Sequence, residues 1–206
     1  MAHELKAFFD KDTFTMTYVV SDPMTKDAIV IDPVLDYDPA SSIYFYDSVD
    51  EVEKYLKEKE FNVHDILETH AHADHVTGAQ ELKRRFPQSK VGIGKNITQV
   101  QDLFSGVYNL KGFPTNGEQF DVLLDESEPL KAGTIEVKTI FTPGHTPACS
   151  SYLIGDMLFT GDALFMPDFG TGRCDVPAGS AEDLYHSVHE KLYKLPDETR
   201  VFVGHD

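Results

Sequence analysis

The chain has 206 residues, with 41% hydrophobic and 26% charged residues, as expected for a globular protein with room for one full core. Its formal net charge of −17 repels phosphate backbones and anionic lipid, so nucleic-acid and membrane partners are disfavoured. The N-terminal segment MAHELKAFFDKDTF lacks the apolar core of a secretory signal, and no apolar run approaches the length of a membrane span. We therefore expect a cytoplasmic protein whose two cysteines, Cys149 and Cys174, are reduced thiols.

The first half of the chain begins with short strand patterns and continues with a loop and a helix. Strands are predicted at residues 15–21 and 28–32, where β-branched and aromatic side chains are frequent. Residues 37–46 are predicted as a loop, and Ser48 is expected to cap a helix that runs to about Lys59. Further on we expect a buried strand at 66–68, a helix at 77–85, a strand at 91–93 and a helix at 98–104.

The second half has the same style of pattern. Strands are predicted at 134–141, 150–154, 157–160 and 200–203, and a long helix is predicted at 181–193. We find no repeat and no linker, which favours one domain over residues 1–206. Two batches of strands, each followed by helices, suit two face-to-face sheets with helices outside, although other α/β folds also fit.

Histidines gather in one short segment, His70-Ala71-His72-Ala73-Asp74-His75, directly after a predicted strand. His70 and His72 are two residues apart, so both imidazoles can leave the strand on the same side. Neutral imidazoles and a carboxylate that meet at one point are what a divalent transition metal requires. This segment therefore predicts a metal site.

Three later units have the same design, in which a polar residue follows a strand and a glycine. They are Pro-Gly-His145, Thr-Gly-Asp162 and Val-Gly-His205, and the last lies next to the end of the sequence at Asp206. Each unit alone is weak, because a histidine after a glycine is usually a surface turn. Together with the histidine segment they indicate a metal centre.

The segments THAHADH, TPGHT, TGDALF and VGHD, in this order, resemble the metallo-β-lactamase superfamily over essentially the whole chain. The resemblance implies an α+β fold, the αββα sandwich, with two mixed β-sheets flanked by helices and the metal at one edge between them. The superfamily is chemically broad, so the fold alone does not define the reaction. Its members typically continue beyond the VGHD segment, and we expect this sequence to be shortened after Asp206.

The stretch 172–196, beginning Gly-Arg-Cys-Asp, is most similar to the persulfide dioxygenase family and unlike glyoxalase II. This resemblance implies one Fe(II) per chain, held by the catalytic residues His70, His145 and Asp162. Two imidazoles and a carboxylate on one face of the iron leave positions free for reactants. The implied reaction converts glutathione persulfide, O₂ and water to sulfite and glutathione.

The same resemblance assigns the other polar residues. His72, Asp74, His75 and His205 would orient the iron ligands, or would hold a second metal in a hydrolase. Arg173 would bind a glutathione carboxylate, with an ion pair to Asp175 as the competing interpretation. Cys174 replaces the threonine that is common in the family and would lie close to the substrate.

Two other functions stay open at this point. The first is a dinuclear zinc hydrolase of glyoxalase II type, or a lactonase, because all seven ligand types are present. The second is a non-catalytic sensor of sulfur species, which the complete ligand set disfavours. The expected partners are a glutathione-linked thiol or persulfide and O₂, and a homodimer is compatible with the sequence.

Overall fold

The computed structural model describes residues 3–206, and over this range the strands form two main sheets and two short two-stranded pairs. The first sheet has the order β1-β2-β3-β7-β9-β10, with strands Glu4–Asp10, Thr15–Ser21, Asp27–Ile31, Asn62–Glu68, Lys90–Gly94 and Val122–Leu124. The second has the order β11-β12-β13-β14-β15, with strands Leu130–Ala132, Ile135–Phe141, Ser150–Ile154, Met157–Phe159 and Arg200–Phe202. Both sheets mix parallel and antiparallel pairs, as predicted.

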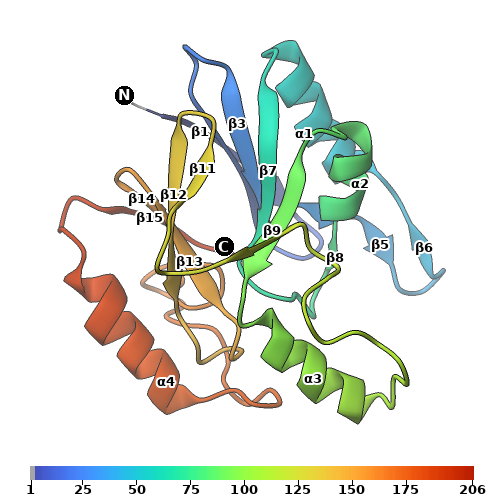
Figure 1. Ribbon diagram of the computed structural model, residues 1–206, viewed down its shortest axis with the longest axis vertical. Coiled ribbons are helices and arrows are strands. Elements are labelled where there is room, and N and C mark those ends of the chain that lie inside the picture. The colour runs from blue at the N-terminus through green and yellow to red at the C-terminus, as the bar shows by residue number, and fades with distance from the viewer. Residues whose placement is uncertain (1–2) are drawn as a thin grey trace.

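The helices lie on the outer faces of the two sheets, so the αββα sandwich is confirmed (Figure 1). Helices α1 (Asp47–Glu58) and α2 (Ala79–Arg85) pack on the first sheet. Helix α4 (Ala181–His186) packs on the second and continues as a π turn, Ser187–Lys191, and a 3₁₀ turn, Leu192–Lys194. Helix α3 (Ile97–Val107) lies near the lower edge in Figure 1 and contacts the end of β9.

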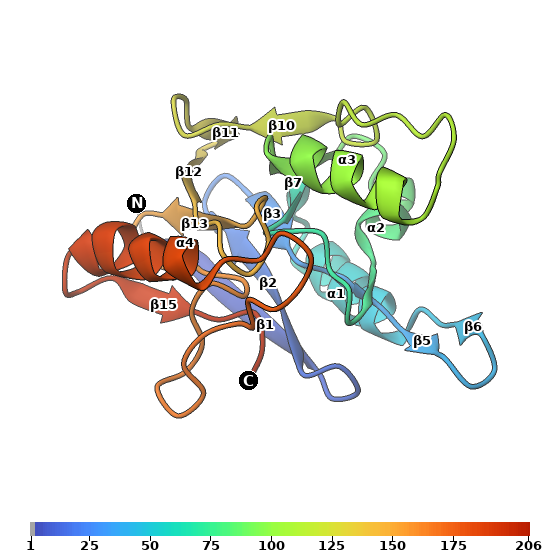
Figure 2. The ribbon, with the colours of Figure 1, turned by 90° about the horizontal axis from the view of Figure 1, so that it is seen from below.

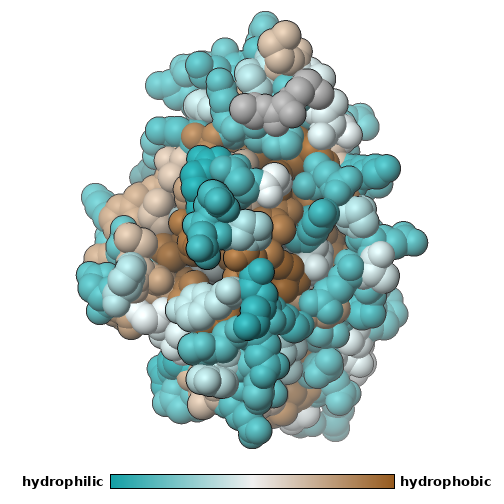
Figure 3. Space-filling view, turned by 90° about the vertical axis from the view of Figure 1, so that its left-hand side faces the viewer, coloured by the Kyte–Doolittle hydropathy of each residue, from teal (hydrophilic) through white to brown (hydrophobic). Residues whose placement is uncertain are grey.

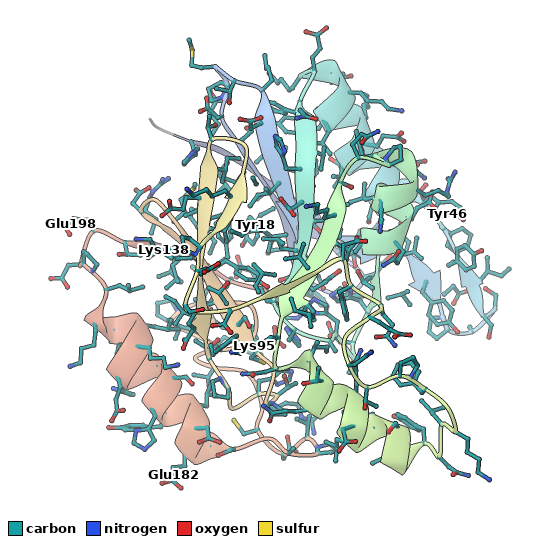
Figure 4. All side chains as sticks on the ribbon, in the orientation of Figure 1. Tyr18, Tyr46, Lys95, Lys138, Glu182 and Glu198 are labelled. Carbon is teal, nitrogen blue, oxygen red and sulfur yellow. The ribbon has the colours of Figure 1, made fainter. Side chains whose placement is uncertain are left out.

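Alternating side chains of the strands fill the two interfaces of the sandwich. In β2, Val19 points toward α1, whereas Tyr18 and Val20 point between the sheets. Tyr18 lies at the centre of the molecule in Figure 4, and its hydroxyl donates a hydrogen bond of 2.7 Å to the Val203 carbonyl oxygen. This buried contact ties the first sheet to the segment that ends in His205.

Several predicted boundaries are wrong. Ser48 does not cap α1: Tyr46 precedes the helix, and Ser48 lies inside it and donates its backbone NH and hydroxyl to the Asp36 carboxylate. Residue Thr77 belongs to the two-residue strand β8 (Val76–Thr77), which pairs with β4 (Val34–Leu35), so α2 starts later than predicted.

The sequence patterns also missed three strands of the two main sheets and misread one loop. Strands β1, β10 and β11 were not predicted, because β1 is an edge strand of mixed composition and the other two are only three residues long. The predicted loop 37–46 contains a small hairpin of β5 (Tyr37–Asp38) and β6 (Ile43–Tyr44), with exposed aromatic side chains. The hairpin projects from the body of the molecule in Figure 2.

One flank of the molecule is largely hydrophilic. The flank seen in Figure 3 is covered mainly by hydrophilic residues, and hydrophobic residues show between them in its central part. Across residues 3–206, no helix combines the length and the apolar character needed to cross a membrane.

Candidate metal centre

Four strand ends bring the predicted polar residues to one edge of the sandwich. His70 follows β7 in the first sheet, whereas His145, Asp162 and His205 follow β12, β14 and β15 in the second. The C-terminal end of the chain therefore lies at this edge, between the β1–β2 hairpin and the loop after β14 (Figure 2). The units that are far apart in the sequence do meet at one place.

His70, His145 and Asp162 form the most compact group. One ligand atom from each lies within 4.8 Å of the others, which is close enough for all three to contact one ion. Asp162 Oδ2 is 3.8 Å from His70 Nε2 and 3.5 Å from His145 Nε2. His70 and Asp162 are buried, and two nitrogens with one oxygen are donors suited to a first-row transition metal.

Buried atoms without hydrogen-bond partners mark the same place. Seven such side-chain atoms occur among residues 3–206, and four belong to the metal cluster: His70 Nε2, His72 Nδ1, His75 Nε2 and Asp162 Oδ1. Each unsatisfied buried polar group costs about 1–3 kcal/mol, so folded proteins rarely collect them without a ligand. A bound metal ion would satisfy these atoms together.

The histidines are oriented by hydrogen bonds on the side away from the cluster. His145 Nδ1 donates to the Arg173 carbonyl oxygen at 2.8 Å, and His75 Nδ1 donates to the Val76 carbonyl oxygen at 3.1 Å. Thr69 gives its hydroxyl proton to Asp32 at 2.8 Å, so it accepts the His70 Nδ1 proton at 3.0 Å. In all three rings Nε2 therefore keeps the lone pair that a metal requires.

Burial favours the neutral forms of these ligands. Burial and the nearby histidines hold the pKa of His70 well below its usual value, and burial with His72 lowers that of His75 to about 4. Burial also raises the pKa of Asp162, although the neighbouring His205 and His145 oppose this. Burial thus favours the uncharged imidazole in both histidines, which is the form that binds a metal.

A second group lies beside the first. Ligand atoms of His72, Asp74 and His75 are within 4.8 Å of one another. His205 Nε2 is 3.4 Å from Asp74 Oδ2 and 3.4 Å from Asp162 Oδ1, so it lies between the two groups. All seven predicted residues are therefore assembled, and their positions allow one metal or two.

Two glycines make the close approach of these strand ends possible. Gly161 has φ +50°, and a Cβ there would lie 2.5 Å from Thr69 Oγ1. A Cβ on Gly204 would lie 2.9 Å from Asp162 Oδ1. The strand–glycine–ligand pattern of the sequence thus has a steric cause.

Two carboxylates of the site were not predicted from the sequence. Asp32 and Glu68 are buried, and each accepts a hydrogen bond of 3.1 Å from His72 Nε2. Each is an acidic residue at the end of an apolar strand, AIVID and DILE, and this is the signal that would have indicated them. A charge at such a position needs a partner, and the histidine segment supplies one.

The residues predicted to bind substrate lie farther from the cluster. The Arg173 side chain is 68% exposed and forms a forked ion pair with Asp175, with N–O distances of 2.7 and 2.8 Å. Only its backbone carbonyl, through His145, contacts the cluster. Cys174 is partly buried against the apolar residues under α4, and burial raises the pKa of its thiol. The competing interpretation of Arg173, the ion pair with Asp175, is the one seen in the structure.

A groove of about 700 Å³ opens beside the second group. Asp74 and His75 form part of its wall, and the β1–β2 turn and the segment 34–39 form the rest. Asp10, Asp12, Asp36 and Asp38 also line it, so its potential is negative. The groove therefore borders the second group, whereas His70, His145 and Asp162 do not line it.

The chain was compared with known proteins. Residues 11–205 match the metallo-beta-lactamase superfamily. The chain is 43% identical over 202 residues to a beta-lactamase hydrolase-like protein of Agrobacterium fabrum, and it spans 46% of that relative's length. It is 42% identical to glyoxylase B2 of Dictyostelium discoideum, covering 98% of this chain and 70% of the relative.

Two further matches concern persulfide dioxygenase. The mitochondrial persulfide dioxygenase ETHE1 of Homo sapiens is 31% identical, covering 98% of this chain and 68% of that protein. The crystal structure of ETHE1 from Myxococcus xanthus is 32% identical and superposes with a TM-score of 0.79, covering 100% of this chain and 76% of that one. The sequence match, the sandwich and the histidine–aspartate cluster agree, and the chain belongs to the metallo-beta-lactamase superfamily.

Proposed function

We propose that the protein is an iron-dependent persulfide dioxygenase that acts on glutathione persulfide. In the reaction RSSH, O₂ and H₂O give RSH, sulfite and two protons. The outer sulfur gives four electrons to O₂, the sulfur–sulfur bond breaks, and the inner sulfur leaves as the thiol. The observation that carries the proposal is the group of His70, His145 and Asp162, two imidazoles and one carboxylate, which is the ligand set of mononuclear non-haem iron oxygenases.

Iron bound to this group would supply a redox-active ion with positions free for a sulfur ligand and O₂. The protein supplies the positioning. The Arg173 carbonyl oxygen and Thr69 hold the rings of His145 and His70, and burial of His70 and Asp162 keeps water away from one side. The groove beside Asp74 and His75 opens next to the second group and is the proposed route of the persulfide to the site.

The similarity to persulfide dioxygenases supports this assignment, since it covers 98% of the chain at 31% identity. The chain spans about half the length of the hydrolase-like relatives it matches, so residues outside it can contribute to substrate binding in a longer protein. The proposed partners of these 206 residues are therefore the small reactants, a glutathione-linked persulfide and O₂.

A dinuclear thioester hydrolase is the second candidate, and one observation favours it. His72, Asp74 and His75 form a separate group with metal-ligand spacing, and His205 lies between this group and Asp162. Two zinc ions held there would activate water for attack on a thioester. The names of the relatives at 43% and 42% identity, hydrolase-like protein and glyoxylase, agree with this chemistry.

Oxygen uptake separates the two candidates. Protein loaded anaerobically with Fe(II) is mixed with glutathione persulfide in an oxygen electrode, and sulfite is measured at the end. We expect one O₂ consumed and one sulfite formed per persulfide, and no hydrolysis of S-lactoylglutathione. Thioester hydrolysis by the zinc-loaded protein, with no O₂ uptake by the iron-loaded protein, would contradict the proposal and support the hydrolase.

A further inference from the structure

A pair of buried carboxylates lies behind the histidine loop. Asp32 and Glu68 are each 3% exposed, and both accept from the same atom, His72 Nε2, at 3.1 Å. We propose that Glu68 is a positioning residue of the metal centre, which acts on the metal through His72. The inference rests on the metal centre of the proposed function and adds a residue that the ligand motifs do not include.

Glu68 and Asp32 share His72 but differ in their other partners, so one does not replace the other. Asp32 also accepts from the Thr69 backbone NH at 2.7 Å and from the Thr69 hydroxyl at 2.8 Å, so it holds the start of the loop. Glu68 instead accepts from the Thr77 hydroxyl, at the far end of the loop. Glu68 therefore joins three points: the end of β7, the ring of His72 and strand β8.

The ring of His72 transmits this constraint to the ligands. Because Nε2 donates to the carboxylates, Nδ1 is the atom that His72 presents to Asp74 and His75, and it is buried without a partner. The ring centroid lies 4.2 Å from that of His70 and 4.2 Å from that of His75. A rotation of His72 would thus disturb a ligand of each group.

A buried carboxylate with only hydroxyl and imidazole partners is costly to desolvate, and an apolar residue would suit the end of an apolar strand better. The desolvation cost of Glu68 is explained if its carboxylate aligns a metal site, because residues that bind the far side of a histidine ligand fix its tautomer and ring orientation. Asp65 offers a matched comparison. It lies on the same strand and is buried, but within residues 3–206 no hydrogen bond or ion pair joins it to the clustered histidines.

The test measures binding of Co(II) to metal-free protein by titration and by its visible absorption spectrum. We expect Glu68→Ala to weaken Co(II) binding about 10- to 100-fold, the usual loss when a partner behind a metal ligand is removed. Glu68→Gln keeps the shape and one acceptor, so we expect a smaller loss, roughly three- to tenfold, with a shifted absorption band. The control Asp65→Asn should bind Co(II) within about twofold of the wild type, because no metal ligand depends on it.

Unchanged affinity and an unchanged Co(II) spectrum in Glu68→Gln would overturn the proposal, and this holds even when Glu68→Ala fails to fold. An equal loss in Asp65→Asn would also overturn it, because the effect would then be one of general stability. The measurement uses neither persulfide nor O₂. A wild type that lacks dioxygenase activity would therefore contradict the proposed function without touching the role of Glu68.

Discussion

The two loops that carry the predicted chemistry differ in how well their polar atoms are satisfied. The histidine loop after β7 contains buried ring nitrogens without hydrogen-bond partners. The loop 172–175 contains an exposed arginine that already has a forked ion pair with its neighbour, Asp175. The comparison teaches that several unsatisfied buried atoms gathered at one place indicate a site built for a ligand, whereas a surface charge that already has a partner can have a purely structural role.

The largest effect should come from the carboxylate of the metal cluster. Asp162→Ala removes the only oxygen donor of the group His70, His145 and Asp162. We expect metal affinity to fall by about 100-fold or more, which exceeds the loss expected for a residue that only supports a metal ligand. Metal content after dialysis measures it. The control is Asp156→Ala, an exposed aspartate paired with Arg200, which should leave metal content unchanged. Full metal retention by Asp162→Ala would remove the cluster as the metal centre.

His205 tests whether one metal or two are bound. His205→Ala should lower the affinity for the tightly bound metal by less than about tenfold. His205 lies between the two groups and is not one of the three residues of the compact triad. The same dialysis experiment measures this. A loss as complete as that of Asp162→Ala would contradict the mononuclear assignment.

Substitutions of Arg173 and Asp175 test whether the exposed ion pair of the loop 172–175 takes part in substrate binding. If Arg173 binds a glutathione carboxylate, Arg173→Ala should raise KM roughly threefold, since an exposed ion pair contributes under about 1 kcal/mol. Asp175→Ala removes the partner of the guanidinium and should lower KM. Steady-state oxygen uptake provides KM, and kcat should not change. If both variants have the KM of the wild type, the ion pair between Arg173 and Asp175 has a purely structural role.

Asp65 tests whether a buried carboxylate that is not joined to the histidines affects stability without affecting metal binding. Burial raises its pKa to about 6, with Lys90 and His64 opposing and Asp121 adding. Protonation therefore favours the folded state, and stability falls as pH rises from the ordinary value of 3.8 to about 6.

We expect Asp65→Asn to raise Tm at pH 7.5 by about 2–4 °C, as ~1 kcal/mol does in a chain of this size, and to leave metal content unchanged. At pH 4 the difference between the variant and the wild type should nearly vanish. A difference in Tm that is the same at both pH values would contradict the buried-proton explanation, and scanning calorimetry measures it.

Much of the fold was predictable because its strands alternate or are continuously apolar. Strands β2 and β3 are buried along almost their whole length, and their apolar and aromatic side chains predicted both. Strand β1 was missed because its ladder with β2, which runs from Glu4 to Asp10, depends on pairing and not on its own mixed composition. The helix start at Asp47 was missed because Ser48 bonds to Asp36, a contact across the sequence.

The site was predictable where the sequence itself places ligands, after strand ends and glycines. Asp32 and Glu68 were missed, because their burial and their common partner His72 arise only when the two strands pair. The Arg173 side chain was assigned to substrate, yet a local partner two residues away holds it. Contacts that the motif does not specify, whether between strands or between near neighbours in the chain, therefore decide which polar residues face the ligand.

Metal analysis tests the central claim most directly. Protein produced without added metal and isolated anaerobically should contain about one iron per chain, as expected for a two-histidine, one-carboxylate site, and should consume O₂ with glutathione persulfide. Two zinc ions per chain, retained together with no reaction toward persulfide in air, would contradict the account.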